Sequence, residues 1–178
     1  MKFKTMIAAA GLGLGGLALT GATAFAQVSS RIDGSGDWSV FKTTTSEGAV
    51  CWITTAPTEW VAMREGKKVD VNRGEIYLMV SIWPDRGVSN EVSVMAGYPY
   101  AKDSRVTAKV GSQSYTLYTD GEGAWLGSPD DDGSMVKAMV KGSTATVTGH
   151  SQRGTETTDT FSLSGFTAAL KAAEKACG

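Results

Sequence analysis

The sequence predicts a mainly β fold, a single antiparallel β-sandwich or flattened barrel with two short helices. From Asp37 onward, apolar and polar residues alternate with a period of two in short segments, which is typical of half-buried strands. These segments are rich in Val, Ile, Thr, Tyr and Trp, the residues that suit a pleated sheet. Glycine, asparagine and aspartate stand between them, where tight turns are expected.

The expected strands follow one another along the chain. They cover residues 38–45, 49–55, 75–83, 90–97, 105–110, 114–119, 144–150 and 158–165. Residues 76–83 are apolar on both faces, which predicts a central strand. Residues 106–110 alternate strictly between apolar and polar side chains, which predicts a strand with one face in water.

Two segments interrupt this alternation and predict helices near 130–141 and 165–177. The first begins with three aspartates, where a helix N-terminus favours anions, and Gly142 follows it, where helices commonly end. The second carries an apolar stripe at helical spacing, made of Phe166, Leu170, Ala173 and Cys177. The last cysteine is therefore expected on the buried face of a terminal helix.

Residues 1–26 have the pattern of a cleaved secretory signal. Two lysines precede a short apolar run, and the small residues before Gln27 predict cleavage between Ala26 and Gln27. A glycine motif at 11–16 resembles a dinucleotide-binding fingerprint, but it lies inside this signal and not between a strand and a helix. Residues 27–178 are expected to form one β-rich domain that is periplasmic or secreted.

Composition excludes two classes of partner for residues 27–178. The full sequence has 17 Lys and Arg against 18 Asp and Glu, and two of the lysines belong to the predicted signal. The remaining chain is slightly acidic and has no basic stripe, so nucleic acid is not an expected partner. No apolar run after the signal approaches the length that a membrane-spanning helix needs, so no membrane span is expected.

Catalytic and metal-binding residues are not evident, and we predict no enzyme activity, no cofactor and no metal. The single histidine, His150, falls on the threonine side of the strand 144–150, which favours a solvated residue over a general base. The aspartates 130–132 lack the alternating spacing of an EF-hand loop. Their place at a helix start explains them better than a calcium site does.

The two cysteines predict a disulfide bond between Cys51 and Cys177. An exported protein meets an oxidising compartment, where two cysteines are more often paired than free. Cys51 shares a strand face with Ala49 and Ile53, and the helix face that carries Cys177 could meet it in the core. An intermolecular bridge or two free thiols remain alternatives.

Aromatic residues in loop-like contexts form a candidate binding surface. Trp60 and Trp125 stand beside proline and glycine residues, and Tyr98 and Tyr100 flank Pro99. Tryptophans in small β domains usually belong to the core or lie beneath loops. The alternative is a surface platform of Trp60, Trp125, Tyr98 and Tyr100 for a sugar ring or a partner protein.

Four segments carry a likeness to a known family. They are Gly36-Asp37-Trp38, the strand around Cys51, Gly97-Tyr98-Pro99 and the ending DTFSLSGFTAAL at 159–170. With them the chain resembles the invasion-associated locus B family, exported proteins of alphaproteobacteria, over roughly residues 36–178. The resemblance implies an exported β-rich domain and, in pathogenic members, a role in host-cell entry. It implies no catalytic residues, and members close to the namesake have additional cysteines in the N-terminal half.

Two hypotheses for the function follow. The first is a non-enzymatic exported protein that binds an envelope component or a host partner. The second is a carbohydrate- or peptidoglycan-binding module that uses the loop tryptophans. The partner is thus expected to be a protein or a glycan of the cell envelope.

Overall fold

The structure is a computed structural model that describes residues 29–178. The predicted signal, residues 1–26, and its cleavage site at Ala26 and Gln27 lie outside the described residues. Strands account for most of the regular structure, and all their pairings are antiparallel. The prediction of a mainly β, antiparallel fold with two helices is therefore confirmed.

The strands form one continuous sheet in the order β1-β2-β3-β6-β7-β10-β9-β8-β11-β12-β4-β5. Their bounds are β1 Ser30–Ser35, β2 Trp38–Thr45, β3 Gly48–Thr55, β4 Glu59–Arg64, β5 Lys67–Lys68, β6 Tyr77–Trp83, β7 Val88–Met95, β8 Arg105–Val110, β9 Gln113–Asp120, β10 Gly123–Trp125, β11 Thr144–His150 and β12 Glu156–Ser162. A single 3₁₀ turn, Pro84–Arg86, links β6 to β7.

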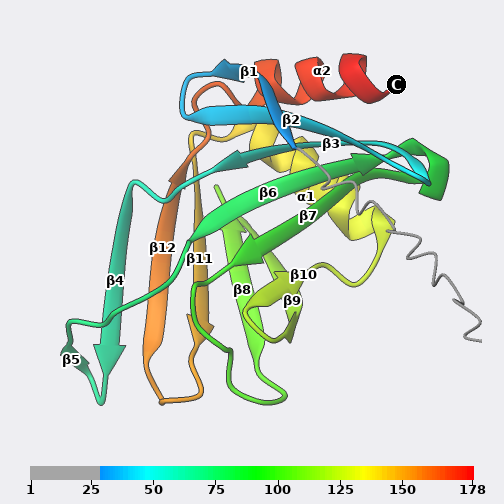
Figure 1. Cartoon of the computed structure of the whole chain (residues 1–178). Helices are drawn as coiled ribbons and strands as arrows, with labels where there is room; N and C mark the ends of the chain where they lie inside the picture. Colours follow the sequence, from blue (N-terminus) through cyan, green and yellow to red (C-terminus); the bar gives the residue numbers. More distant parts are fainter. Residues whose placement is uncertain (1–28) are drawn as a thin grey trace, which may run out of the picture.

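The sheet bends strongly but does not close into a barrel, because β1 and β5 remain its two edges. Figure 1 shows β2 and β3 running across the molecule, while β4, β12, β11 and β8 run down from them. The bend gives the sheet an inner and an outer face. Side chains that alternate along each strand therefore point either into one shared core or outward.

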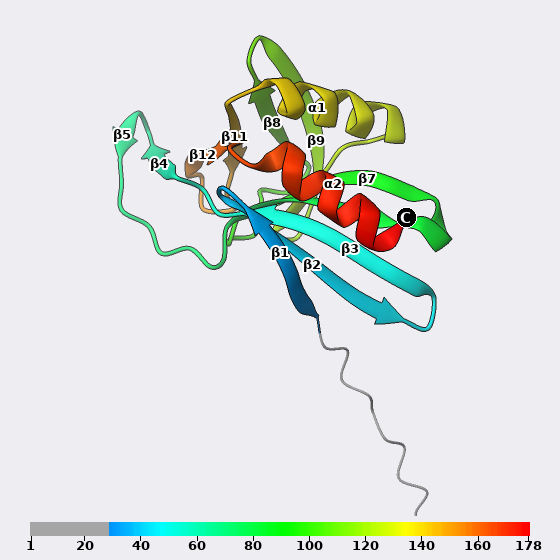
Figure 2. The same cartoon turned by 90° about the horizontal axis from the view of Figure 1, so that it is seen from above.

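Both predicted helices are present, as α1 (Pro129–Lys141) and α2 (Phe166–Cys177). α2 lies across β2 and β3, and α1 lies against β7, β8 and β9 (Figure 2). Both cover the inner face of the sheet. Their apolar stripes join the inward side chains of the strands in a single buried cluster.

The sequence explains why α1 begins where it does. Ser128 caps the helix, because its Oγ accepts a hydrogen bond from the N–H of Asp131, and Pro129 fits the first turn. Asp132, one of the three aspartates, points inward, and its Oδ1 accepts a hydrogen bond of 2.9 Å from the N–H of Val92 on β7. The aspartate run thus starts the helix and also fixes it to the sheet.

A disulfide bond fixes α2 to the sheet at the C-terminal end of the helix. Cys51 on β3 is bonded to Cys177, with a Cα–Cα distance of 5.9 Å, as the sequence predicted. The Nζ of Lys42, on the neighbouring strand β2, donates a hydrogen bond of 2.5 Å to the carbonyl oxygen of Ala176. Lys42 and Cys51 are directly paired across the two strands. The last turn of the helix is thereby held to both strands.

The start of α2 is fixed by a close contact between two turns. Gly165 has φ +88°, and a Cβ atom on it would lie 1.9 Å from the carbonyl oxygen of Ser35. Glycine is therefore the residue that this position accepts. Beside it, Trp38 donates a hydrogen bond of 3.0 Å from Nε1 to the carbonyl oxygen of Ser162, and its ring packs edge-on against Phe166.

Four strands were not expected from the sequence. β4 and β10 contain Trp60 and Trp125, which the sequence placed in loops, β5 consists of two lysines, and β1 precedes the first expected strand. β1 is exposed along most of its length and has an irregular register near Ile32. β4 buries only Ala62, and β10 has three residues. Strands this short or this exposed leave a weak alternation in the sequence.

We expect the disulfide bond to contribute about 2–5 kcal/mol to the free energy of unfolding, because it restricts an unfolded loop with a sequence separation of 126. Replacing both cysteines, Cys51→Ala with Cys177→Ser, should lower the urea midpoint by a corresponding amount. A reductant should shift the midpoint of the wild type and leave that of the double variant unchanged. Equal midpoints for wild type and double variant would contradict this role.

Asp132 should make the stability depend on pH. Burial raises its pKa above the ordinary value of 3.8, helped by the charges of Glu91 and Asp131 and opposed by the Val92 hydrogen bond. A raised pKa gives stability that is fully present below the ordinary value and is lost as pH rises through the folded value. Asp132→Asn keeps the acceptor oxygen without the charge, so its stability relative to wild type should increase between pH 4 and pH 7.

The matched control is Asp132→Ala, which leaves the Val92 N–H unpaired. It should cost about 1–3 kcal/mol in urea unfolding at pH 7. A difference between Asp132→Asn and wild type that is the same at pH 4 and pH 7 would contradict the assignment of a raised pKa.

Candidate binding groove

A groove of about 500 Å³ opens between three chain segments, which Figure 1 shows at the end of the sheet that points away from α2. Its walls are the loop 70–73 after β5, the loop 97–99 after β7 and the turn 151–155 between β11 and β12. Arg64, Glu122 and Thr157 complete the lining. A cavity of this size is in the range that small-molecule sites occupy.

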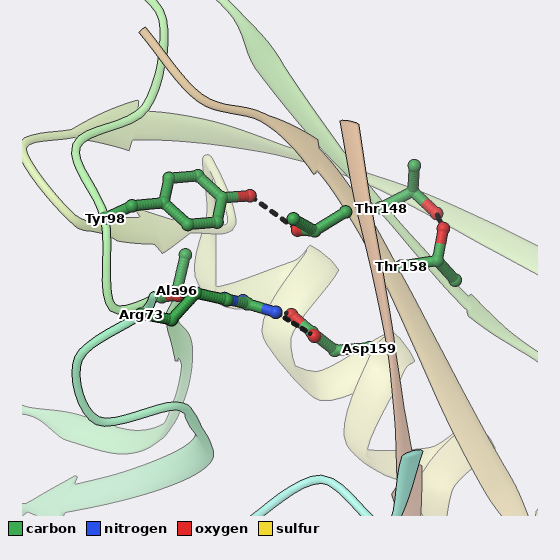
Figure 3. Close-up of polar contacts among 7 residues, drawn as sticks. Arg73, Ala96, Tyr98, Thr148, Thr158 and Asp159 are labelled. Atoms are coloured by element: carbon green, nitrogen blue, oxygen red, sulfur yellow. Dashed lines mark hydrogen bonds and ion pairs between the residues drawn. The ribbon is translucent and has the colours of Figure 1, made fainter. Parts of the chain in front are cut away.

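A buried ion pair holds one wall of the groove in place. Both terminal nitrogens of Arg73 donate to the two carboxylate oxygens of Asp159 on β12, at 2.5 and 2.8 Å (Figure 3). Each of the two side chains is only 3% exposed. A bidentate pair of this kind fixes both the position and the orientation of the guanidinium. Arg73 therefore joins the loop 70–73 to the far side of the sheet.

The same arginine also joins this loop to the end of β7. Its Nε donates a hydrogen bond of 2.9 Å to the carbonyl oxygen of Ala96 (Figure 3). The N–H of Gly74 donates to the carbonyl oxygen of Gly97 at 2.7 Å. Gly97 has φ +68°, and a Cβ on it would lie 2.6 Å from the Gly74 oxygen, so the two backbones meet at a distance that only glycine allows.

Tyr98 forms part of the floor of the groove. Its hydroxyl shares a hydrogen bond of 2.6 Å with Oγ1 of Thr157, and its ring packs edge-on against Tyr100. Burial raises the pKa of Tyr98, against the lowering effects of the Thr157 hydrogen bond and of Arg73. Burial also raises the pKa of Tyr100. Both phenols keep their proton at neutral pH, so neither adds a negative charge to the site.

The opposite wall is a turn stiffened by hydroxyl groups. Nε and a terminal nitrogen of Arg64 donate to Oγ1 of Thr155, at 3.1 and 2.6 Å. The N–H of Thr155 donates to Oγ of Ser151, and the N–H of Ser151 donates to the carbonyl oxygen of Thr155. Ser151, Thr155 and Thr157 are buried. This wall is therefore rigid before any ligand arrives.

Five exposed polar side chains point to the groove from this frame. They are Asp70, Asn72, Glu122, Gln152 and Arg153. None of their side chains makes a hydrogen bond or an ion pair with another residue of 29–178. A fixed frame with free polar groups on its rim is suited to non-covalent binding.

The aromatic residues named from the sequence divide between the two faces of the sheet. Trp60 pairs with inward-pointing Asp159, is 41% exposed, and has Arg73 5.6 Å from its ring centre. Arg73 is also 5.0 Å from the ring centre of Tyr98, so the three residues form one cluster. The expectation that Tyr100 is exposed is wrong, because its ring lies in the core and is 5% exposed.

Trp125 does not join this cluster. Its neighbour in the strand, Ala124, points into the core, so the alternation of side chains places Trp125 on the outer face. There it stacks on Tyr118 of β9, with ring centres 6.0 Å apart. The four aromatic residues therefore do not form one platform.

His150 and the aspartate run lie outside the groove. Nε2 of His150 is 3.5 Å from a carboxylate oxygen of Glu156, and both side chains are exposed. Asp130, Asp131 and Asp132 begin α1. Residues 29–178 contain no group of three or more His, Cys, Asp or Glu that could hold a metal ion. No helix in the same range is long and apolar enough to cross a membrane.

Sequence reasoning missed the Arg73–Asp159 pair. Arg73 stands in a segment read as a simple turn, and Asp159 stands in a segment noted only for its likeness to a family. One signal was present, because Asp159 alternates with Phe161 and so occupies an inward position of its strand. A carboxylate at an inward position requires a partner, although the strand does not say which one.

The model of one protein family matches residues 38–174, and its description is "Invasion associated locus B (IalB) protein". No curated protein and no solved structure matches the chain. The matched range begins at Trp38 and ends within α2, so it includes the groove, while Ser35 and Cys177, which contribute to fixing α2, lie just outside it.

We expect the ion pair to be coupled in a double-mutant cycle. Arg73→Met or Asp159→Leu alone leaves one buried charge without a partner, which should cost about 3–5 kcal/mol in urea unfolding. The double variant has no unpaired charge and should be more stable than either single variant. The exposed pair Arg86–Glu47 is the control, and breaking it with Arg86→Ala should cost no more than about 1 kcal/mol. Additive losses for Arg73 and Asp159 would contradict the coupling.

Proposed function

Since the chain belongs to the invasion-associated locus B family, we propose that it is an exported protein that binds a component of the cell envelope or of a host, without catalysis. The signal-like pattern of residues 1–26 and the Cys51–Cys177 bond support export, because disulfide bonds persist in oxidising compartments. Both the periplasm and the exterior of the cell are oxidising compartments, so the proposal includes a periplasmic and a secreted protein.

The groove is the observation that carries the proposal of binding. Its frame is fixed by Arg73, Asp159 and the Tyr98–Thr157 hydrogen bond, so a ligand need not order it. A site ordered in advance loses less conformational entropy when it binds. Its rim carries polar side chains that have no partner among the described residues and can therefore exchange water for ligand.

The same geometry favours binding over catalysis. The lining residues include no histidine, cysteine or lysine, so the usual nucleophiles and bases are limited to hydroxyls and carboxylates. The hydroxyls of Thr155 and Thr157 already take part in hydrogen bonds with Arg64 and Tyr98. The hydroxyl of Ser151 likewise accepts a hydrogen bond from the N–H of Thr155.

A carbohydrate- or peptidoglycan-binding module is the second candidate. The observation that favours it is the exposed ring of Trp60, which lies beside Arg73 and Tyr98 next to the groove. Aromatic rings with one open face suit the apolar face of a sugar. In this candidate Trp60 has a role and Trp125, on the opposite face of the sheet, has none.

Site-specific photo-crosslinking in the native envelope tests the proposal. A photoreactive phenylalanine analogue at Gln152, on the groove rim, should give a discrete crosslinked product that mass spectrometry identifies. The same analogue at Lys171, which is exposed on α2 at the other end of the molecule, is the matched control and should not give that product.

A crosslinked product that forms equally from Gln152 and Lys171 would contradict the groove as the binding site. The crosslink from Gln152 should also weaken when Glu122→Ala and Arg153→Ala are introduced together, because both side chains line the groove. An unchanged yield in that variant would contradict the groove as the binding site as well.

A further inference from the structure

The polar groups of the groove share a shape. Apart from the hydroxyls and Arg73, whose nitrogens already bond Asp159 and Ala96, every polar side chain there ends in a planar group with two hydrogen-bonding atoms side by side, which are two donors in arginine, two acceptors in a carboxylate and one of each in an amide. These side chains are Arg64, Asp70, Asn72, Glu122, Gln152 and Arg153. A planar pair of donors or acceptors matches two hydroxyls on neighbouring carbon atoms, so one side chain can bond both.

The floor of the groove supplies the apolar part that a sugar also needs. Tyr98 and Pro99 lie side by side along it, and neither adds charge. A saccharide has polar edges and apolar C–H faces, so it matches a site with an aromatic floor and a polar rim. Trp60, beside Arg73, extends the aromatic surface beyond the groove.

Two arginines in the groove indicate which charge the ligand should carry. Arg64 projects from β4 onto Thr155, and Arg153 stands in the same turn as Thr155, so two guanidinium groups belong to one wall. Neither forms an ion pair with another residue of 29–178. Arginine binds carboxylates through two parallel hydrogen bonds between opposite charges, and the hydroxyls of a neutral sugar lack that charge.

We infer that the groove binds a saccharide that carries a carboxylate, with the carboxylate on the wall of Arg64 and Arg153. The inference rests on the proposed function and names the ligand class for the same site. Asp70 and Glu122 then accept hydrogen bonds from sugar hydroxyls, the Asn72 amide accepts from them or donates to them, and Tyr98 packs against the ring. The lactyl carboxylate of muramic acid, which is free where peptidoglycan carries no stem peptide, and the carboxylate of uronic acids in other polysaccharides share this chemistry.

Calorimetric titration distinguishes the two sources and tests the carboxylate. The probes are the N-acetylglucosamine–N-acetylmuramic acid disaccharide, a galacturonic acid dimer, and the carboxamide form of each. We expect one acid to bind at least tenfold more tightly than its carboxamide, because a hydrogen bond to a charged group contributes more than a neutral one. The acid that binds more tightly identifies the source.

Arg153→Gln should remove this preference. It should weaken binding of the acid at least tenfold, because the charge–charge contact with the arginine is lost. Binding of the carboxamide should change by no more than about threefold, because the carboxamide makes no charge–charge contact with either the wild type or the variant. Lys171→Gln removes the same charge from an exposed site on α2 and is the matched control, with unchanged affinity. Arg153 is exposed in a turn, so the variant should fold, and its thermal midpoint verifies this.

Glu122→Gln separates a saccharide from a zwitterionic peptide. The amide of Gln still offers a sugar hydroxyl an acceptor oxygen, so the saccharide should lose no more than about fivefold in affinity. A peptide ammonium group would need the charge. Tighter binding of the dipeptide alanyl-glutamate than of both acids, lost in Glu122→Gln, would overturn the inference in favour of peptides.

Three further results would overturn the inference while the Gln152 crosslink still forms, which leaves the proposed function standing. They are no binding of either acid, equal binding of acid and carboxamide, and an equal effect of Arg153→Gln on both. Failure of the crosslink together with failure of all titrations would overturn the proposed function as well.

Discussion

The buried pair of Arg73 and Asp159 is the interaction on which the binding end of the molecule depends. The sheet is not closed, so its β4–β12 side and its β6–β7 side meet at this end without a common ladder of hydrogen bonds. Arg73 spans the two sides, with Asp159 on β12 and the carbonyl oxygen of Ala96 after β7 as its acceptors. Two buried charges are costly without each other, so the loop has one favourable position.

The opposite end of the molecule is fixed by different means. There the Cys51–Cys177 bond and the contact between Ser35 and Gly165 hold α2 against β2 and β3. Among the segments that gave the family resemblance, Trp38 and the part of the ending around Phe166 belong to this end. Gly97-Tyr98-Pro99 lines the groove, and Asp159 holds its frame. The recognisable segments therefore report the fold and the frame of the groove, and none of them contains the exposed polar side chains of its rim.

The fold was predictable to the extent that local periodicity determines it. The period of two gave the longer strands, the helical stripe gave α2, and the compartment argument gave the disulfide bond. Arg73 and Asp159 are 86 residues apart, and no local pattern connects a turn residue to a strand residue at that distance. Tyr100 was misplaced for a similar reason, since its burial depends on a bridge to Ser151 in another turn.

The division between frame and rim explains why family membership and ligand need not go together. The frame uses residues whose replacement leaves a buried charge or a backbone clash, such as Asp159 and Gly97. The rim uses exposed side chains of loops and turns, such as Gln152 and Arg153, which do not pack in the core. Because surface changes of that kind usually alter stability by less than about 0.5 kcal/mol, the rim can change its chemistry while the frame stays intact. In such a molecule specificity resides in the loops, and the ligand has to be inferred from the rim of this chain alone.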